Sequence, residues 1–134
     1  MLAAIPLMIV PLILYNVIIA GLAGPSVSAL NDTVTSLSMM SGALWTMSWG
    51  DVLIVLALAL LFIEVLKATR TGPSSVLDHM LSMLVFIAFL VEFLLVQTAA
   101  THVFFILMVI AFIDVIAGFS VSIKSAGRDV SIGL

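Results

Sequence analysis

Four long apolar segments constrain the fold of this sequence more than any other feature. They cover residues 2–23, 52–68, 76–96 and 103–123. Each falls in the range of about 17–25 residues that a helix needs to cross the hydrocarbon core of a bilayer. Only 8% of the residues are charged, whereas a soluble domain has about 25%. We therefore predict an all-α membrane protein, in which residues 1–134 form a single domain of four transmembrane helices packed as a bundle.

The composition also excludes several classes of function. Four Lys and Arg residues in all are too few for a nucleic-acid surface. The absence of cysteine excludes disulfides, zinc–thiolate sites and iron–sulfur clusters. Only two His and one Tyr leave little material for acid–base catalysis, and we interpret His79 and His102 as polar caps at the two membrane surfaces. We expect no enzyme activity, no cofactor and no metal.

The positive charges predict an orientation in the membrane. Lys67 and Arg70 follow the second segment, and Lys124 and Arg128 follow the fourth. Because cytoplasmic connections carry the excess of Lys and Arg, these residues are candidate interface anchors and both termini are expected in the cytoplasm. We expect a bacterial inner membrane. The first segment lacks a basic start, so we interpret it as a retained helix rather than a signal peptide, kinked at Pro11.

The connection between the first two segments is the only long one. Apolar residues recur in it at helical spacing: Val27, Leu30, Val34 and Leu37. This spacing predicts a short amphipathic helix at about 25–40 that lies on the outer membrane surface. The alternative is an unstructured, hydrated connector. Trp45 and Trp49 come just before the second segment, where aromatic side chains anchor a helix at the interface.

Two segments share a five-residue pattern. Residues 62–66 read Phe-Ile-Glu-Val-Leu, and residues 112–116 read Phe-Ile-Asp-Val-Ile. The match indicates either an internal repeat that relates two helical hairpins or a coincidence within the small alphabet of membrane helices.

Three acidic residues lie within the apolar segments, namely Glu64, Glu92 and Asp114. The other acids are grouped outside the apolar runs: Asp32, Asp51 and Asp129 in the connections, and Asp78 at the very start of the third segment. Each intramembrane acid costs roughly 2.5–3.5 kcal/mol at a helix centre on insertion scales, so it is expected to face another helix or a hydrated cavity. Counted from the outer ends of their helices, Glu64 and Asp114 lie at the same depth, whereas Glu92 lies nearer the outer surface with Asn16.

Small residues accompany the acids on their helix faces. They are Ala57, Ala88, Ala111 and Gly118. Small residues allow helices to approach closely, so that a carboxyl group can hydrogen-bond to the neighbouring helix; for Glu64, a pair with Lys67 is the simpler alternative. The same polar residues, with Asn16, are also candidates for a proton or cation site, because two carboxylates at one depth cannot both ionise without a bound proton or cation.

The preferred hypothesis is a small non-catalytic subunit, or a self-assembling scaffold, of a membrane complex. Its partners would be the lipid bilayer and either copies of itself or other membrane subunits, without nucleic acid. The alternative is a homo-oligomeric proton or cation channel, or a coupled transporter, that uses the intramembrane carboxylates. A third hypothesis is a holin-like pore that permeabilises membranes.

Overall fold

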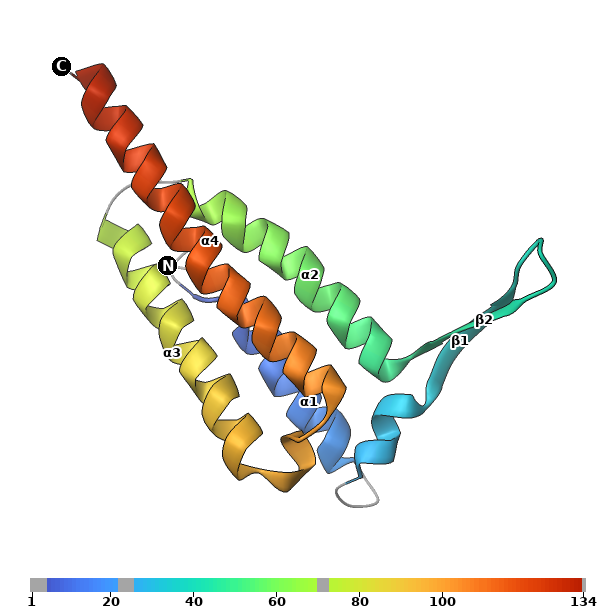
Figure 1. Ribbon diagram of the computed structural model, residues 1–134. Coiled ribbons are helices and arrows are strands. Elements are labelled where there is room, and N and C mark those ends of the chain that lie inside the picture. The colour runs from blue at the N-terminus through green and yellow to red at the C-terminus, as the bar shows by residue number, and fades with distance from the viewer. Residues whose placement is uncertain (1–4, 22–25, 70–72, 134) are drawn as a thin grey trace.

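The computed structural model describes residues 5–21, 26–69 and 73–133. The α-helices in this part of the chain are α1 (Ile9–Ala20), α2 (Trp49–Ala68), α3 (Pro73–Leu95) and α4 (His102–Gly133). Two short 3-10 helices, η2 (Val27–Asn31) and η3 (Gln97–Ala99), and two strands, β1 (Thr33–Ser38) and β2 (Leu44–Ser48), connect them. The helices form a bundle, and the strands form a hairpin at one end of it (Figure 1). We call this the hairpin end and the opposite one the far end.

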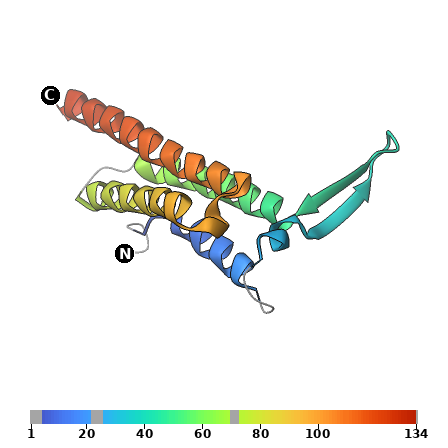
Figure 2. The ribbon, with the colours of Figure 1, turned by 60° about the horizontal axis from the view of Figure 1, so that its bottom comes forward.

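Three helices are long and apolar enough to cross a membrane: Trp49–Ala68, Val76–Leu95 and His102–Val121. The predicted ranges followed the apolar runs, but all three helices extend beyond them, and α2 begins at Trp49 rather than at residue 52. The third helix begins at Pro73, a residue that suits the first helical position because its fixed φ matches the helix. The fourth continues to Gly133, because backbone hydrogen bonding does not stop where the apolar side chains stop. Its last turns project past the other helices (Figure 2).

The first predicted segment, 2–23, is helical over a much shorter range. Its helix α1 has 12 residues and is about 18 Å long, less than the ~30 Å hydrocarbon thickness. Residues 2–4 and 22–23 lie outside the described part of the chain. Pro11 is the third residue of α1, where a backbone N–H has no partner within the helix in any case. Pro11 therefore removes no hydrogen bond, and the reason for the expected kink disappears.

The prediction of an amphipathic helix at about 25–40 is wrong over the described residues. Only the 3-10 turn η2 is helical there, and Thr33–Ser38 forms strand β1 instead. It pairs antiparallel with β2, with Leu37 opposite Trp45. A turn that ends at Gly42, with a φ of +89°, closes the hairpin. The helical spacing was a local coincidence, whereas the strand is stabilised by hydrogen bonds to residues about ten positions away.

An aromatic layer lies in the half of the bundle nearer the hairpin. Tyr15, Phe89 and Phe104, from three different helices, are all fully buried. The ring of Phe104 packs edge-on against Tyr15 at a centroid distance of 4.8 Å and against Phe89 at 5.4 Å. Leu107 and Ala111 continue the buried face of α4, which packs against both α2 and α3. Helix α4 is therefore the central element of the core.

The start of α2 is fixed by a capping box and a close helix contact. Ser48 Oγ accepts a hydrogen bond from the backbone N–H of Asp51, and the Asp51 carboxylate accepts one from the backbone N–H of Ser48. This reciprocal pairing satisfies two backbone donors that would otherwise be free. Next to it, Gly50 lies against α4: a Cβ here would be 2.9 Å from Val103 Cγ2 and 3.3 Å from the Leu30 carbonyl oxygen.

We expect Gly50→Ala to lower the apparent melting temperature of the protein in detergent. Alanine favours a helix by up to about 1 kcal/mol over glycine, but overpacking a tight contact costs typically about 1–3 kcal/mol. Thermal unfolding followed by circular dichroism measures the balance. Ala59→Val, at an exposed position of the same helix, is the control and should leave the transition unchanged. A Gly50→Ala protein that melts above the wild type would contradict the close contact.

Candidate functional site

Ionisable side chains from three helices meet toward the far end of the bundle. Glu64 comes from the last turns of α2, Asp78 from the first turns of α3 and Asp114 from the middle of α4. Each is at most 5% exposed. We call these residues, together with Lys67, His79 and Ser82, the ionic cluster. Sequence reasoning grouped Asp78 with the acids outside the apolar runs, and that grouping is wrong, because Asp78 lies in the first turns of α3 and is buried in the bundle.

Lys67 links the parts of this cluster. Its ammonium nitrogen Nζ lies 2.9 Å from Glu64 Oε1 and 3.5 Å from Asp78 Oδ1. It also donates to the carbonyl oxygen of Ile5 at 2.9 Å, while the backbone N–H of Leu7 donates to the same Glu64 oxygen at 3.2 Å. One amine therefore joins α2, α3 and the segment before α1. The Glu64–Lys67 pair is the simpler alternative raised from the sequence.

Asp114 shares this environment but not the amine. It interacts electrostatically with Glu64, Asp78 and Lys67 and lies beside Ser82. Asp114 and Glu64, which were singled out from the sequence, are therefore close enough to interact. Three carboxylates around one ammonium group leave an excess of negative charge in a buried place, which is costly unless a proton or a cation compensates for it.

Three buried polar atoms of the cluster have no hydrogen-bond partner among the described residues. They are Asp114 Oδ2, Ser82 Oγ and His79 Nε2. His79 was expected as a cap at the membrane surface, but it is buried, and its imidazole lies 5.0 Å from the ring of Phe119. Gly118 makes room for it, since a Cβ there would lie 3.1 Å from the imidazole. Unpartnered polar atoms are rare in protein interiors, so a proton or a hydrogen-bonding molecule bound at these three atoms would be stabilising.

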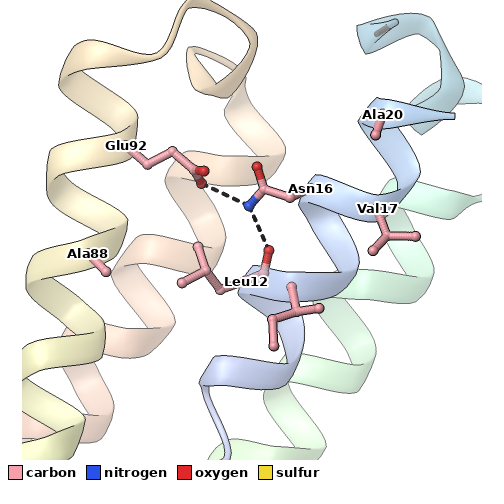
Figure 3. Close-up of a pocket in the computed structure, with 7 residues that line it drawn as sticks. Leu12, Asn16, Val17, Ala20, Ala88 and Glu92 are labelled. Carbon is pink, nitrogen blue, oxygen red and sulfur yellow. Dashed lines mark hydrogen bonds between the residues drawn. The ribbon is translucent and has the colours of Figure 1, made fainter. Parts of the chain in front are cut away.

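A second polar contact lies nearer the hairpin end. Asn16 Nδ2 donates to Glu92 Oε2 at 3.2 Å and to the Leu12 carbonyl oxygen at 2.9 Å. The two side chains meet across the space between α1 and α3 (Figure 3). Glu92 is therefore not part of the ionic cluster, and it lies at the height of Asn16, as expected from the sequence.

The Asn16–Glu92 pair lies in an open groove of about 460 Å³. The other residues that line it are Leu12, Ile13, Val17, Ala20 and Ala88. Asn16 is exposed and Glu92 only half-buried. Among the small residues singled out from the sequence, Ala57, Ala111 and Gly118 are buried inside the bundle, whereas Ala88 is exposed in this groove.

Sequence reasoning missed one polar contact close by. The hydroxyl of Tyr15 lies 2.8 Å from the Thr98 carbonyl oxygen and 2.8 Å from Thr101 Oγ1, so it ties α1 to the connection before α4. The signal was available, because a lone tyrosine in an apolar segment usually finds a hydrogen-bond partner when it is buried. Along α4, Asp114 of the ionic cluster lies about 20 Å from Thr101.

The anchors expected from the sequence have mixed outcomes. Trp45 and Trp49 are exposed near the start of α2, as an interface position requires. Lys67 is instead largely withdrawn into the ionic cluster, with 14% of its side chain exposed. Arg70 and the side chains of Lys124 and Arg128 lie outside the described part of the chain.

Comparison with known proteins gives no family. The chain matches no protein-family model, no curated protein and no solved structure. The function is therefore inferred from the residues and their contacts.

We expect Lys67→Met to destabilise the bundle by on the order of 3–5 kcal/mol, because it leaves buried carboxylates without their cation. The double variant Glu64→Gln/Lys67→Met removes both partners and should recover part of this loss. Melting temperatures of the wild type, both single variants and the double variant measure the coupling. If Lys67→Met melts like the wild type, the cluster does not hold these helices together.

Proposed function

We propose that this protein is a non-catalytic membrane protein that works as a subunit or self-assembling scaffold of a membrane complex. The observation that carries the proposal is the groove between α1 and α3. It presents a hydrogen-bonded polar pair and two alanines on a surface whose other lining residues are apolar. We further propose a bacterial inner membrane with both termini in the cytoplasm, on the basis of the distribution of Lys and Arg.

The groove is suited to a transmembrane helix. Glu92 lies within the apolar range Val76–Leu95, and polar groups that face lipid are costly unless a partner covers them. Ala20 and Ala88 would let the backbone of an additional helix approach closely, and the Asn16–Glu92 pair offers it hydrogen-bonding groups. The polar groups of the ionic cluster, by contrast, already serve contacts within one chain.

Ala88→Leu should therefore prevent assembly without unfolding the protein. The leucine would fill the groove, while the exposed position of Ala88 leaves the core of the bundle intact. Native mass spectrometry after purification in a mild detergent measures the assembly, and circular dichroism checks the fold. Ala59→Leu is the matched control, because it places the same side chain on an exposed face of α2.

The masses also identify the source of the helix. A multiple of the chain's own mass indicates a self-assembling scaffold, and an additional chain in fixed ratio indicates a subunit of a larger complex. A wild-type monomer, or an assembly that Ala88→Leu leaves unchanged, would overturn the role of the groove.

A second candidate is a proton or monovalent-cation carrier centred on Asp114. It is supported by the excess of carboxylates in the ionic cluster and by its three unpartnered atoms. The described residues include no group of three or more acidic or histidine side chains placed to bind a metal ion, which favours a proton over a multivalent metal.

For this candidate, Asp114→Asn should abolish proton flux into vesicles and leave the fold intact. The asparagine is isosteric but cannot release a proton. Flux is followed with a pH-sensitive dye enclosed in vesicles that contain the purified protein. Asp32→Asn, at an exposed position, serves as the control. Equal flux in the wild type and Asp114→Asn would exclude Asp114 from transport, and no flux in the wild type would overturn the candidate.

A further inference from the structure

The β-hairpin has two chemically different faces. Residues directly opposite one another in an antiparallel pair share a face, and the face alternates along each strand. The pairs Leu37–Trp45 and Thr35–Met47 therefore lie on one face, which we call the apolar face. The pairs Ser36–Thr46 and Ser38–Leu44 lie on the other, which is polar apart from Leu44.

The apolar face of this hairpin is exposed, which is unfavourable in water. Leu37 and Trp45 are 53% and 42% exposed. A two-stranded hairpin is marginally stable in water unless something covers its apolar face. Soluble proteins usually protect such strand edges with lysine or other charged residues, or with proline, but residues 33–50 contain no charged residue and no proline.

The position of the hairpin indicates what covers it. Strand β2 ends at Ser48, and the apolar helix α2 begins at the next residue, Trp49. The hairpin therefore starts where a membrane-crossing helix starts. It leaves the end of the bundle to one side rather than continuing the line of the helices (Figures 1 and 2). Its exposed apolar residues thus lie next to the start of an apolar helix, and Trp45 and Trp49 are the residue type enriched at the membrane–water interface.

We propose that the hairpin is an interfacial anchor that lies in the headgroup layer of the bilayer with its apolar face toward the acyl chains. It cannot enter the hydrocarbon, because the outer edges of both strands carry unpaired backbone groups. At the headgroup level, water satisfies these edges while Leu37, Trp45 and Met47 leave the aqueous phase. The hairpin has no charge, so neutral phospholipid is sufficient and anionic lipid is not required.

Site-directed spin labelling tests this arrangement residue by residue. The chain has no cysteine, so single cysteines can be introduced into the full-length protein without background. The variants Leu37→Cys and Met47→Cys label the apolar face, and Ser36→Cys and Thr46→Cys label the polar face. Each is reconstituted in phosphatidylcholine vesicles, and label collisions are measured with oxygen, which concentrates in lipid, and with a water-soluble nickel chelate.

Labels at 37 and 47 should collide more with oxygen, and labels at 36 and 46 more with the nickel chelate, with the same result at high salt. If all four labels are equally accessible to nickel, the hairpin stands in water and the proposal is wrong. If the apolar-face labels are shielded from both reagents, or show spin–spin broadening between copies, a protein covers this face instead, which also overturns the proposal.

A variant without cysteine gives an independent measurement. Trp49→Phe leaves Trp45 as the single tryptophan, because the chain has two. Its fluorescence should be quenched by phospholipid brominated near the top of the acyl chains and little affected by aqueous iodide. Strong quenching by iodide alone would contradict the anchor. Neither measurement involves the groove between α1 and α3. The proposed anchor and the proposed function can therefore be contradicted independently of each other.

Discussion

The contact of the Lys67 ammonium group with two carboxylates and a backbone carbonyl oxygen is the interaction on which the far end of the bundle depends. An ammonium group withdrawn from solvent loses its hydration, and it is tolerated only where partners replace the lost water. Here the partners come from α2, α3 and the segment before α1, so satisfying one charge brings three parts of the chain together. The same contact explains why Glu64 and Asp78 can be buried among apolar helices.

The two polar regions of the bundle differ in how far the protein encloses them. The ionic cluster is enclosed by the protein's own helices, and the atoms it leaves without partners face inward. The Asn16–Glu92 pair is open on one side, in a groove between two helices. Enclosed polar groups are suited to holding a bundle together or exchanging a proton, whereas open ones are suited to contact with another helix.

Two elements lie outside the bundle, one at each end. The hairpin projects to one side at one end, and the last turns of α4 project from the other end (Figure 1). The hairpin contributes no side chain to the buried core, and its proposed role is contact with the membrane. The proposed groove contact and the proposed anchor together would hold the protein in a defined position next to another membrane component.

Several features could be predicted from the sequence because they depend on local spacing. The three apolar helices follow from uninterrupted apolar runs, and the Glu64–Lys67 pair follows from a separation of three residues, which places two side chains on one helix face. These are properties that a helix has before it packs against anything. The burial of Glu64 and Asp114 follows from the cost of leaving an acidic side chain facing lipid in an apolar helix.

Tertiary structure decided the rest. Residues 33–38 form a strand because of hydrogen bonds to β2 across a turn, which outweigh the helical spacing of their apolar residues. Asp78 joins the ionic cluster because α2 and α4 present an ammonium group and a carboxylate to the start of α3. Four small residues looked equivalent in the sequence, yet three became core and only Ala88 was left on a surface. The sequence alone determined which segments avoid water, but pairing between distant segments determined which side chains meet, because those contacts depend on how the helices are arranged rather than on spacing along one of them.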